Sequence, residues 1–369
     1  MRIALTGATG FLGWHVRCRA MSRGLDCVPI RREATSDPDR LARVLRDVDA
    51  VVHCAGVTRG TDSAVIDGNL AAARALAAAV RRVERPIRIV YANSTHARGD
   101  SDYGAAKRKA AELLAGTVPG RFSDVVLPNL FGEHGRPYHN SFVATFCHDV
   151  AAGRRPADVR DREVRLLHAQ DAAQLLIAEV HTAGDRAVEP EAEPVRVGAV
   201  LRLLTEFEST YRDGQLPDLA GRFRGQLFRT YRSHLFPQRF PVALPRRADA
   251  RGTLVECVRA GTNGGQAFIS TTRPGATRGD HVHLRKFERF VVVDGRAEIA
   301  LRRLFTDRVV RYRVDGDRPS IVDIPTLWTH RLTNVGADRV TTFFWTDEVY
   351  RVEDADTFPC PVTGGQAPA

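Results

Sequence analysis

The stretch from 275 to 295 constrains the fold more than any other part of the chain, because it places metal-ligand side chains at strand spacing. It reads GATRGDHVHLRKFERFVVVDG, in which a single residue separates His281 from His283 and Glu288 follows shortly after. Residues two apart on a strand face the same way, so both imidazoles can point into a small β-barrel. With His330 they form a three-His, one-Glu set suited to Zn, Fe, Ni or Mn. Histidines on a strand can also serve only in packing, but four ligand types at this spacing favour a metal, and zinc is our first choice.

The whole chain has the composition of a two-domain protein with ordinary cores. It has 369 residues, of which 43% are hydrophobic and 27% charged. Six scattered cysteines without paired spacing favour a reducing cytoplasm. The net charge of +10 comes mostly from arginines spread along the chain, so we expect no nucleic-acid partner. The apolar runs are short for a membrane span, so we expect no membrane contact.

The N-terminus predicts a dinucleotide site. A short apolar strand runs into Thr-Gly-Ala-Thr-Gly-Phe-Leu-Gly, and a helical pattern follows. Gly7 allows a tight turn, Gly10 lets the backbone approach a pyrophosphate, and Gly13 lets the helix pack closely, while Phe11 and Leu12 complete the turn. The order of strand, glycines and helix makes this pattern specific.

Two further segments are expected to line the same cofactor. The strand 27–30 ends in Arg31 and Arg32, where an NAD enzyme usually carries an acid for the ribose hydroxyls. Arginine suits a 2′-phosphate, which favours NADPH, although two solvated arginines would look the same. A buried strand from 50 then delivers Ala55 and Gly56 in a second loop near the cofactor.

The chemistry of this half is expected at the end of the strand 87–92, where Ser94 follows. Tyr103 and Lys107 are four residues apart on one helix face, so an ammonium would lie near a phenol and lower its pKa. Such a phenol can transfer a proton at neutral pH. Lys107 can also hold the nicotinamide ribose, and Ser94 can hydrogen-bond the substrate oxygen.

These motifs resemble the extended short-chain dehydrogenase/reductases, an α/β family with a Rossmann-type, doubly wound parallel sheet, most of whose members act on nucleotide sugars. The resemblance covers residues 1 to about 240 and implies substrate-binding positions at Ser94, Asn129, Asn140 and Ser141. Dehydratases of the family follow the serine with an Asp-Glu pair, where this chain has Thr95-His96. Without those carboxylates elimination lacks its acid and base, so a ketone reductase is preferred.

The C-terminal part predicts an all-β barrel, because short strands rich in Val, Ile and Thr alternate with turns. It resembles a cupin, and we expect the domains to be 1–243 and 244–369. The second cupin motif keeps Pro325, His330 and Asn334 but has Leu327 where glycine is usual, which puts the shape of that turn in question.

The fusion resembles the bifunctional enzymes of bacterial capsular-polysaccharide synthesis that help make UDP-N-acetyl-L-fucosamine. The resemblance implies C3 epimerisation of a UDP-4-keto-6-deoxy-N-acetylhexosamine by the cupin, C4 reduction with NADPH by the first domain, and a homodimer through the barrel. Lys286 could be the proton carrier of the epimerase, or simply an exposed lysine. Two alternatives stay open: a reductase whose cupin only binds or dimerises, and a non-enzymatic NADP-sensing regulator.

Overall fold

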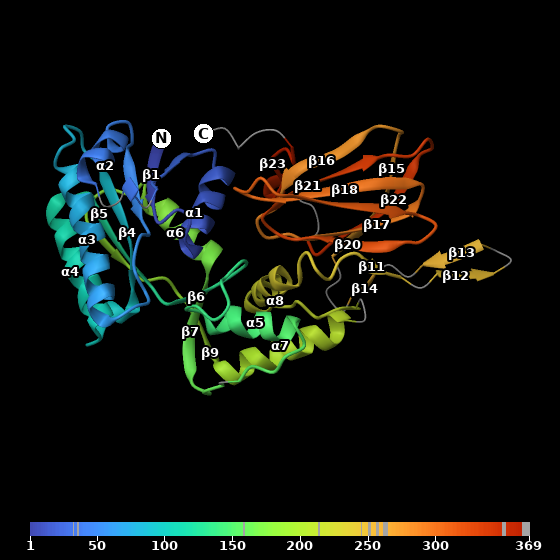
Figure 1. Cartoon of the computed structure of the whole chain (residues 1–369), viewed down its shortest axis with the longest axis horizontal. Helices are drawn as coiled ribbons and strands as arrows, with labels where there is room; N and C mark the ends of the chain where they lie inside the picture. The colour runs from blue at the N-terminus through green and yellow to red at the C-terminus, as the bar shows by residue number, and fades with distance from the viewer. Residues whose placement is uncertain are drawn as a thin grey trace. The chain divides into compact units, whose positions relative to one another are not determined.

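The computed structural model describes residues 1–31, 33–34, 37–157, 159–212, 215–244, 246–249, 252–255, 258–260, 265–348 and 352–363. The chain divides into two compact units, shown in Figure 1. The first contains 1–142 and 161–197, and the second contains 143–160 and the residues from 198 onward. Residues 198–243 therefore pack with the second unit, while the expected domain boundary at 243 stays a prediction.

The first unit is built on a six-stranded sheet in the order β2-β1-β3-β4-β5-β8, with every pair parallel. Its strands are β1 (Arg2–Thr6), β2 (Asp26–Pro29), β3 (Ala50–His53), β4 (Arg88–Ser94), β5 (Phe122–Leu127) and β8 (Arg186–Val188). A smaller sheet of the same unit has the order β6-β7-β9 and contains β6 (Asn129–Phe131), β7 (Glu163–His168) and β9 (Glu193–Arg196).

Helices cover both faces of the large sheet, because successive strand residues face opposite sides. Val51 and Ile89 join one core with α2 (Pro38–Leu45), α3 (Asp62–Val80) and α4 (Asp102–Thr117). Val52 and Val90 join the other core with α1 (Phe11–Ser22) and α6 (Ala169–Glu179). The short 3₁₀ helix η2 (Thr95–Arg98) connects β4 to α4. This arrangement confirms the expected Rossmann-type sheet.

One helix tests the expectation that the apolar runs are short for a membrane span. Among the described residues, α3 has the length and hydropathy for one, at 19 residues and a hydropathy of 1.2. Its residues Ala73, Leu76, Ala77 and Ala79 are buried in the sheet's core. A core helix satisfies the same two criteria, so α3 is weak evidence for a membrane.

The second unit is mainly antiparallel β-structure, as expected. One five-stranded sheet has the order β11-β20-β17-β22-β15 and the other β19-β18-β21-β16-β23. The strands of the first are β11 (Val242–Ala243), β15 (Gln266–Thr272), β17 (Glu288–Asp294), β20 (Ser320–Ile324) and β22 (Val340–Thr346). Those of the second are β16 (Thr277–Val282), β18 (Arg296–Arg303), β19 (Val309–Asp315), β21 (Trp328–Asn334) and β23 (Phe358–Pro359).

The remaining elements of this unit are helices and short strands. The helices are α5 (Phe142–Ala151), α7 (Val197–Arg212), α8 (Arg222–Leu235) and the 3₁₀ turn η3 (Val352–Asp354). Strand β10 (Gln215–Leu216) pairs with β14 (Arg259–Ala260), and β12 (Arg246–Asp249) pairs with β13 (Gly252–Val255). Helix α8 packs on the barrel, where the rings of Phe228 and Phe287 are 5.9 Å apart.

Candidate active site and metal centre

The glycine turn between β1 and α1 has the geometry of an anion cradle. Gly7 has a φ of +68°, and a Cβ there would lie 2.7 Å from the Ala55 nitrogen. A Cβ on Gly13 would lie 2.1 Å from the Gly7 oxygen, so only glycine lets α1 pack this closely. Gly10 is the N-cap of α1, whose first turn has no acidic residue and no capping side chain. Phe11 begins the helix, and the exposed backbone N–H groups fit a pyrophosphate.

The loop after β3 is held beside this turn by two buried side chains. The Ala55 nitrogen donates to the Thr6 hydroxyl at 3.2 Å. Asn69 donates from Nδ2 to the Val57 oxygen at 2.7 Å, and a Cβ on Gly56 would lie 2.8 Å from the Asn69 Oδ1. The buried position of Asn69 on α3 was not anticipated from the sequence. Asn69, a polar residue among alanines, was the available signal that α3 positions this loop.

The two arginines expected at the adenosine ribose are described only in part. Arg31 is exposed and follows the end of β2, which is the neighbour of β1 in the sheet. That position is the carboxyl edge of the parallel strands, where nucleotides bind in such folds. Arg32 lies outside the described residues.

Ser94 and Tyr103 are brought together at the same edge of the sheet. Ser94 ends β4, Tyr103 lies in the first turn of α4, and the two side chains are close enough to interact. Burial raises the pKa of Tyr103, and the Ser94 side chain opposes part of this rise. The expected lowering of this pKa by Lys107 is therefore wrong for the protein alone: burial dominates, and Ser94 supplies the opposing effect.

The ammonium of Lys107 contacts the end of β4. Its Nζ donates to the Ala92 oxygen at 2.7 Å and lies 4.1 Å from the centre of the Tyr91 ring. Only 4% of Lys107 is exposed, and burial lowers its pKa to about 8. The ammonium therefore ties α4 to the end of β4, one turn below Tyr103.

The residues expected to contact the substrate lie on two loops of the first unit. Asn129 is exposed at the start of β6. Asn140 accepts a hydrogen bond from Arg59 Nε at 3.0 Å and donates to the Thr58 hydroxyl, which joins its loop to the one after β3. Ser141 is half-buried beside it in the chain.

A buried polar network behind the glycine turn was not anticipated from the sequence. His15 of α1 bonds through Nε2 to the Glu133 oxygen at 3.1 Å and through Nδ1 to Gln170 Nε2 at 3.1 Å. His168 Nε2 is 3.2 Å from the Glu133 carboxylate. Burial acts to raise the pKa of Glu133, but His168 holds it well below its usual range. The network connects α1, the loop after β6, and α6.

The four expected metal ligands converge in the second unit. His281 lies on β16, His283 just after it, Glu288 at the start of β17 and His330 on β21. One ligand atom from each lies within 4.8 Å of all the others. Nε2 of His283 and Nε2 of His330 lie 3.3 and 3.1 Å from the Glu288 carboxylate without the geometry of a hydrogen bond, and all three groups are ligands that a metal would satisfy.

The protonation of these side chains also fits a metal. Burial, with the neighbouring imidazoles, lowers the pKa of His281 to about 3, and burial lowers that of His330. Neutral imidazole is the form that binds metals. The residues present therefore fit a divalent cation of the zinc class.

The unusual Leu327 is accommodated in the turn where glycine was expected. Its φ is +67°, a left-handed conformation that normally favours glycine. Its side chain is fully buried, and its nitrogen donates to the His283 oxygen at 2.7 Å. Burial of the leucine side chain offsets the backbone strain, and the turn links the two halves of the ligand set.

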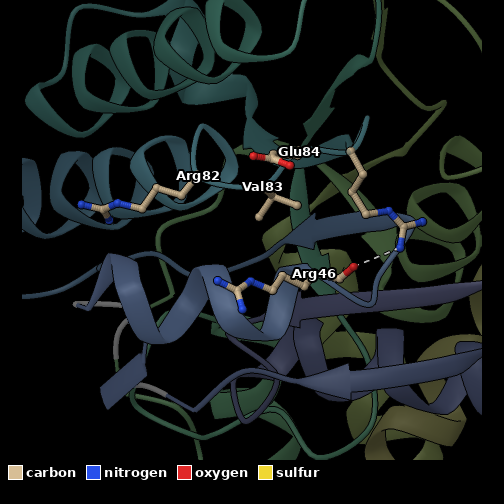
Figure 2. Close-up of a pocket in the computed structure, with 5 residues that line it drawn as sticks. Arg46, Arg82, Val83 and Glu84 are labelled. Atoms are coloured by element: carbon tan, nitrogen blue, oxygen red, sulfur yellow. Dashed lines mark hydrogen bonds between the residues drawn. The ribbon is translucent and has the colours of Figure 1, made fainter.

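A cavity of about 420 Å³ lies elsewhere in the first unit and is shown in Figure 2. Its lining residues are Arg46, Arg82, Val83, Glu84 and Arg85. They follow the C-terminal ends of α2 and α3, at the edge where the parallel strands begin. Ligands of such sheets bind at the opposite, carboxyl edge, so this cavity is separate from the cofactor turn.

Comparison with known proteins places the chain in a family. Residues 3–192 match the NAD dependent epimerase/dehydratase family and residues 247–358 match the polysaccharide biosynthesis C-terminal domain. The chain is 32% identical to the UDP-2-acetamido-2,6-beta-L-arabino-hexul-4-ose reductase of Pseudomonas aeruginosa, over 99% of this chain and 100% of that protein. The chain belongs to the NAD dependent epimerase/dehydratase family. Membership implies a nicotinamide dinucleotide, NAD or NADP, as cofactor.

Two further relatives agree with this membership. The structure of the capsular polysaccharide assembling protein CapF from Staphylococcus aureus has a TM-score of 0.59 and 29% identity, covering 98% of this chain and 100% of that one. The dTDP-6-deoxy-L-talose 4-dehydrogenase of Kitasatospora kifunensis is 27% identical over 51% of this chain and 72% of its own length. The expected resemblance to capsular-polysaccharide synthesis proteins is thereby confirmed.

Proposed function

We propose that the chain is an NADPH-dependent reductase of a UDP-linked 2-acetamido-2,6-dideoxy-4-hexulose, acting at C4. The observation that carries this proposal is the pairing of Ser94, at the end of β4, with Tyr103, in the first turn of α4, at the carboxyl edge of the sheet that also carries the glycine turn. Full-length similarity to the Pseudomonas aeruginosa reductase supports the same substrate class.

The chain's own residues would supply binding and proton transfer. When bound, NADPH supplies the hydride. The N–H groups at the start of α1 hold its pyrophosphate, and Arg31 with Arg32 hold the 2′-phosphate. Tyr103, a phenol that is protonated at neutral pH, donates a proton to the C4 oxygen, while Ser94 hydrogen-bonds the same oxygen. Lys107 is assigned to the nicotinamide ribose, and Asn129, Asn140 and Ser141 are assigned to the sugar nucleotide.

The decisive experiment is incubation of the purified protein with NADPH and a small panel of UDP- and dTDP-4-keto-6-deoxysugars. We expect NADPH absorbance to fall fastest with the UDP-linked N-acetyl sugar. Tyr103→Phe is expected to lower the rate by about 10²- to 10⁴-fold, because it removes the general acid. Tyr312→Phe, on β19 of the other unit, is the matched control. No oxidation of NADPH with any ketosugar would contradict the proposal and favour a cofactor-sensing role.

We further propose that the C-terminal β domain epimerises C3 of the same ketosugar before reduction. The C4 ketone makes the C3 proton acidic. We propose zinc as the divalent metal of this domain. When bound, the metal supplies positive charge close to the reacting sugar. Lys286 lies in the loop between ligands His283 and Glu288, and is assigned to move the proton.

A second candidate function for this domain is binding or dimerisation without chemistry. The position of the Lys286 ammonium favours this function, because the group is buried and already donates to the Thr357 hydroxyl at 3.3 Å. Solvent deuterium exchange at C3 distinguishes the two functions. We expect Lys286→Met to abolish exchange while Arg285→Met, its half-exposed neighbour, retains it. Unchanged exchange in Lys286→Met would remove the epimerase role of that residue.

The oligomer and the compartment are also proposals. Strand β15 is an edge of its sheet among the described strands and exposes Ile269, at 67%, and Phe268, at 39%. An exposed apolar edge strand is a usual pairing surface, which supports a homodimer through the barrel. Light scattering of the purified protein tests it, and a monomeric mass would refute it. The described cysteines are all unpaired, which supports a reducing cytoplasm.

A further inference from the structure

One segment of the second unit, Ala355–Thr357, contacts the loop between His283 and Glu288 through Asp356 and Thr357, and most of these hydrogen bonds are made by Asp356. Asp356 is buried and has a φ of +43°. Among the described residues, its hydrogen bonds go to the loop 284–286 and to Nδ1 of His283. It lies behind His283, on the side away from the other three ligands.

The carboxylate of Asp356 binds three consecutive backbone N–H groups. Leu284 donates to Oδ1 at 3.2 Å, while Arg285 and Lys286 donate to Oδ2 at 3.0 and 2.9 Å. Successive N–H groups that converge in this way form a small anion-binding concavity. The carboxylate therefore determines the path of the chain between two metal ligands.

The carbonyl of the same residue contacts the metal ligand His283. The Asp356 oxygen is 2.6 Å from Nδ1 of His283, and a carbonyl can only accept, so Nδ1 must carry the proton. The lone pair of the ring then lies on Nε2, which is 3.3 Å from the Glu288 carboxylate and faces the ligand cluster. Such outer partners orient metal-binding imidazoles and raise their affinity for the ion.

We infer that Asp356 is a positioning residue for the metal centre. Its carbonyl holds His283 in the tautomer that binds metal, and its carboxylate holds the loop that carries Lys286. The ammonium of Lys286 is placed from the same segment, by the Thr357 hydroxyl. This inference rests on the proposed metal site and refines it, because the Asp356 contacts explain the conformation of the loop between the ligands His283 and Glu288.

The test compares Asp356→Asn with Asp354→Asn in the full-length protein. Asparagine tolerates the positive φ but replaces one carboxylate oxygen with an NH₂ group, which leaves one or two of the three N–H donors without an acceptor. Asp354 lies two residues away, is exposed, and pairs with Arg285 at the surface. We expect Asp356→Asn to weaken Zn²⁺ binding by about 10- to 100-fold in competition with a chromophoric chelator. Asp354→Asn is expected to bind as the wild type does.

Hydrogen exchange of the metal-free protein separates this inference from the metal site itself. We expect the amides of Leu284, Arg285 and Lys286 to be protected in the wild type and to exchange at least tenfold faster in Asp356→Asn. If the wild type bound no Zn²⁺, the metal proposal would fail, while this exchange result would still decide the role of Asp356. Equal Zn²⁺ affinity and equal exchange in the two variants would overturn the inference, as would nitrogen NMR spectra of the metal-free protein in which Nδ1 of His283 carries no proton.

Discussion

At the scale of single residues, the environment of Tyr103 decides its chemistry. A phenol used as a general acid must be protonated at the working pH. Burial raises the pKa of Tyr103, which keeps the proton on, and the Ser94 hydroxyl limits the rise. Burial lowers the pKa of Lys107 to about 8. Its ammonium donates to the Ala92 oxygen and so holds α4, the helix that carries Tyr103, on the end of β4.

The pH dependence of reduction tests this assignment. Removing the Ser94 hydroxyl removes the interaction that lowers the Tyr103 pKa, so in Ser94→Ala that pKa rises further. Because the protonated phenol is the active form, the alkaline limb of kcat/KM moves to higher pH. The plateau value falls by about 10²-fold, since one donor to the developing oxyanion is lost.

Ser101→Ala is the matched control for this change. Ser101 caps α4 by accepting from the Gly104 nitrogen at 3.2 Å. Its loss weakens the helix start by about 1 kcal/mol but leaves the alkaline limb in place. An alkaline limb that stayed in place in Ser94→Ala, or moved to lower pH, would contradict the role given to Ser94.

At the scale of elements, α8 is held on the barrel by a buried charge cluster. Arg232 of α8 is 3.3 Å from the Asp323 carboxylate on β20, and Arg289 of β17 is 2.8 Å from it. The Arg232 guanidinium also lies 3.9 Å from the centre of the Phe287 ring. Arg289 directly follows the metal ligand Glu288, so one strand carries both contacts, on opposite faces.

Loss of the shared carboxylate should therefore be costly. In Asp323→Asn two buried guanidiniums lose their counter-charge, and we expect the free energy of unfolding to fall by about 3 to 5 kcal/mol. Guanidinium chloride unfolding followed by circular dichroism measures it. Arg296→Gln, which removes an exposed pair with Asp315, is expected to change stability by less than about 1 kcal/mol. Similar small effects for both variants would show that the cluster is dispensable.

At the scale of the whole molecule, the two chemistries lie in different compact units. The cofactor turn, Ser94 and Tyr103 belong to the first. All four metal ligands come from the second unit. Metal binding should therefore affect the stability of the second unit and not the hydride transfer of the first.

Removal of the metal tests this separation. A strong chelator is expected to lower the unfolding midpoint of the β domain, because a ligand at 100 times its Kd stabilises by about 2.7 kcal/mol. Reduction of a ketosugar that is already of the correct C3 configuration should keep its rate. His281→Ala should abolish the chelator's effect, and His181→Ala, at an exposed histidine of the first unit, should not. Loss of reduction on chelation would show that the two sites are coupled.

Much of the fold and of the site is determined by local pattern. The glycine turn, the Tyr-Lys spacing and the histidine pair each lie within a few residues, and their meaning depends on the backbone geometry of one turn, helix or strand. Strand and helix types follow from residue periodicity of the same short range. For these reasons the Rossmann sheet, the β domain and the four-ligand cluster could be predicted from sequence alone.

Tertiary structure alone decided which side chains hold the backbone of these motifs in place. Asn69 and Asp356 each contact backbone groups of a separate loop. The His15–Glu133 contact spans 118 residues of sequence. Burial also reversed the expected direction of the Tyr103 pKa shift, because desolvation depends on every element packed around the phenol. Local sequence carries the motifs, whereas long-range contacts and burial set the charge and orientation of the groups within them.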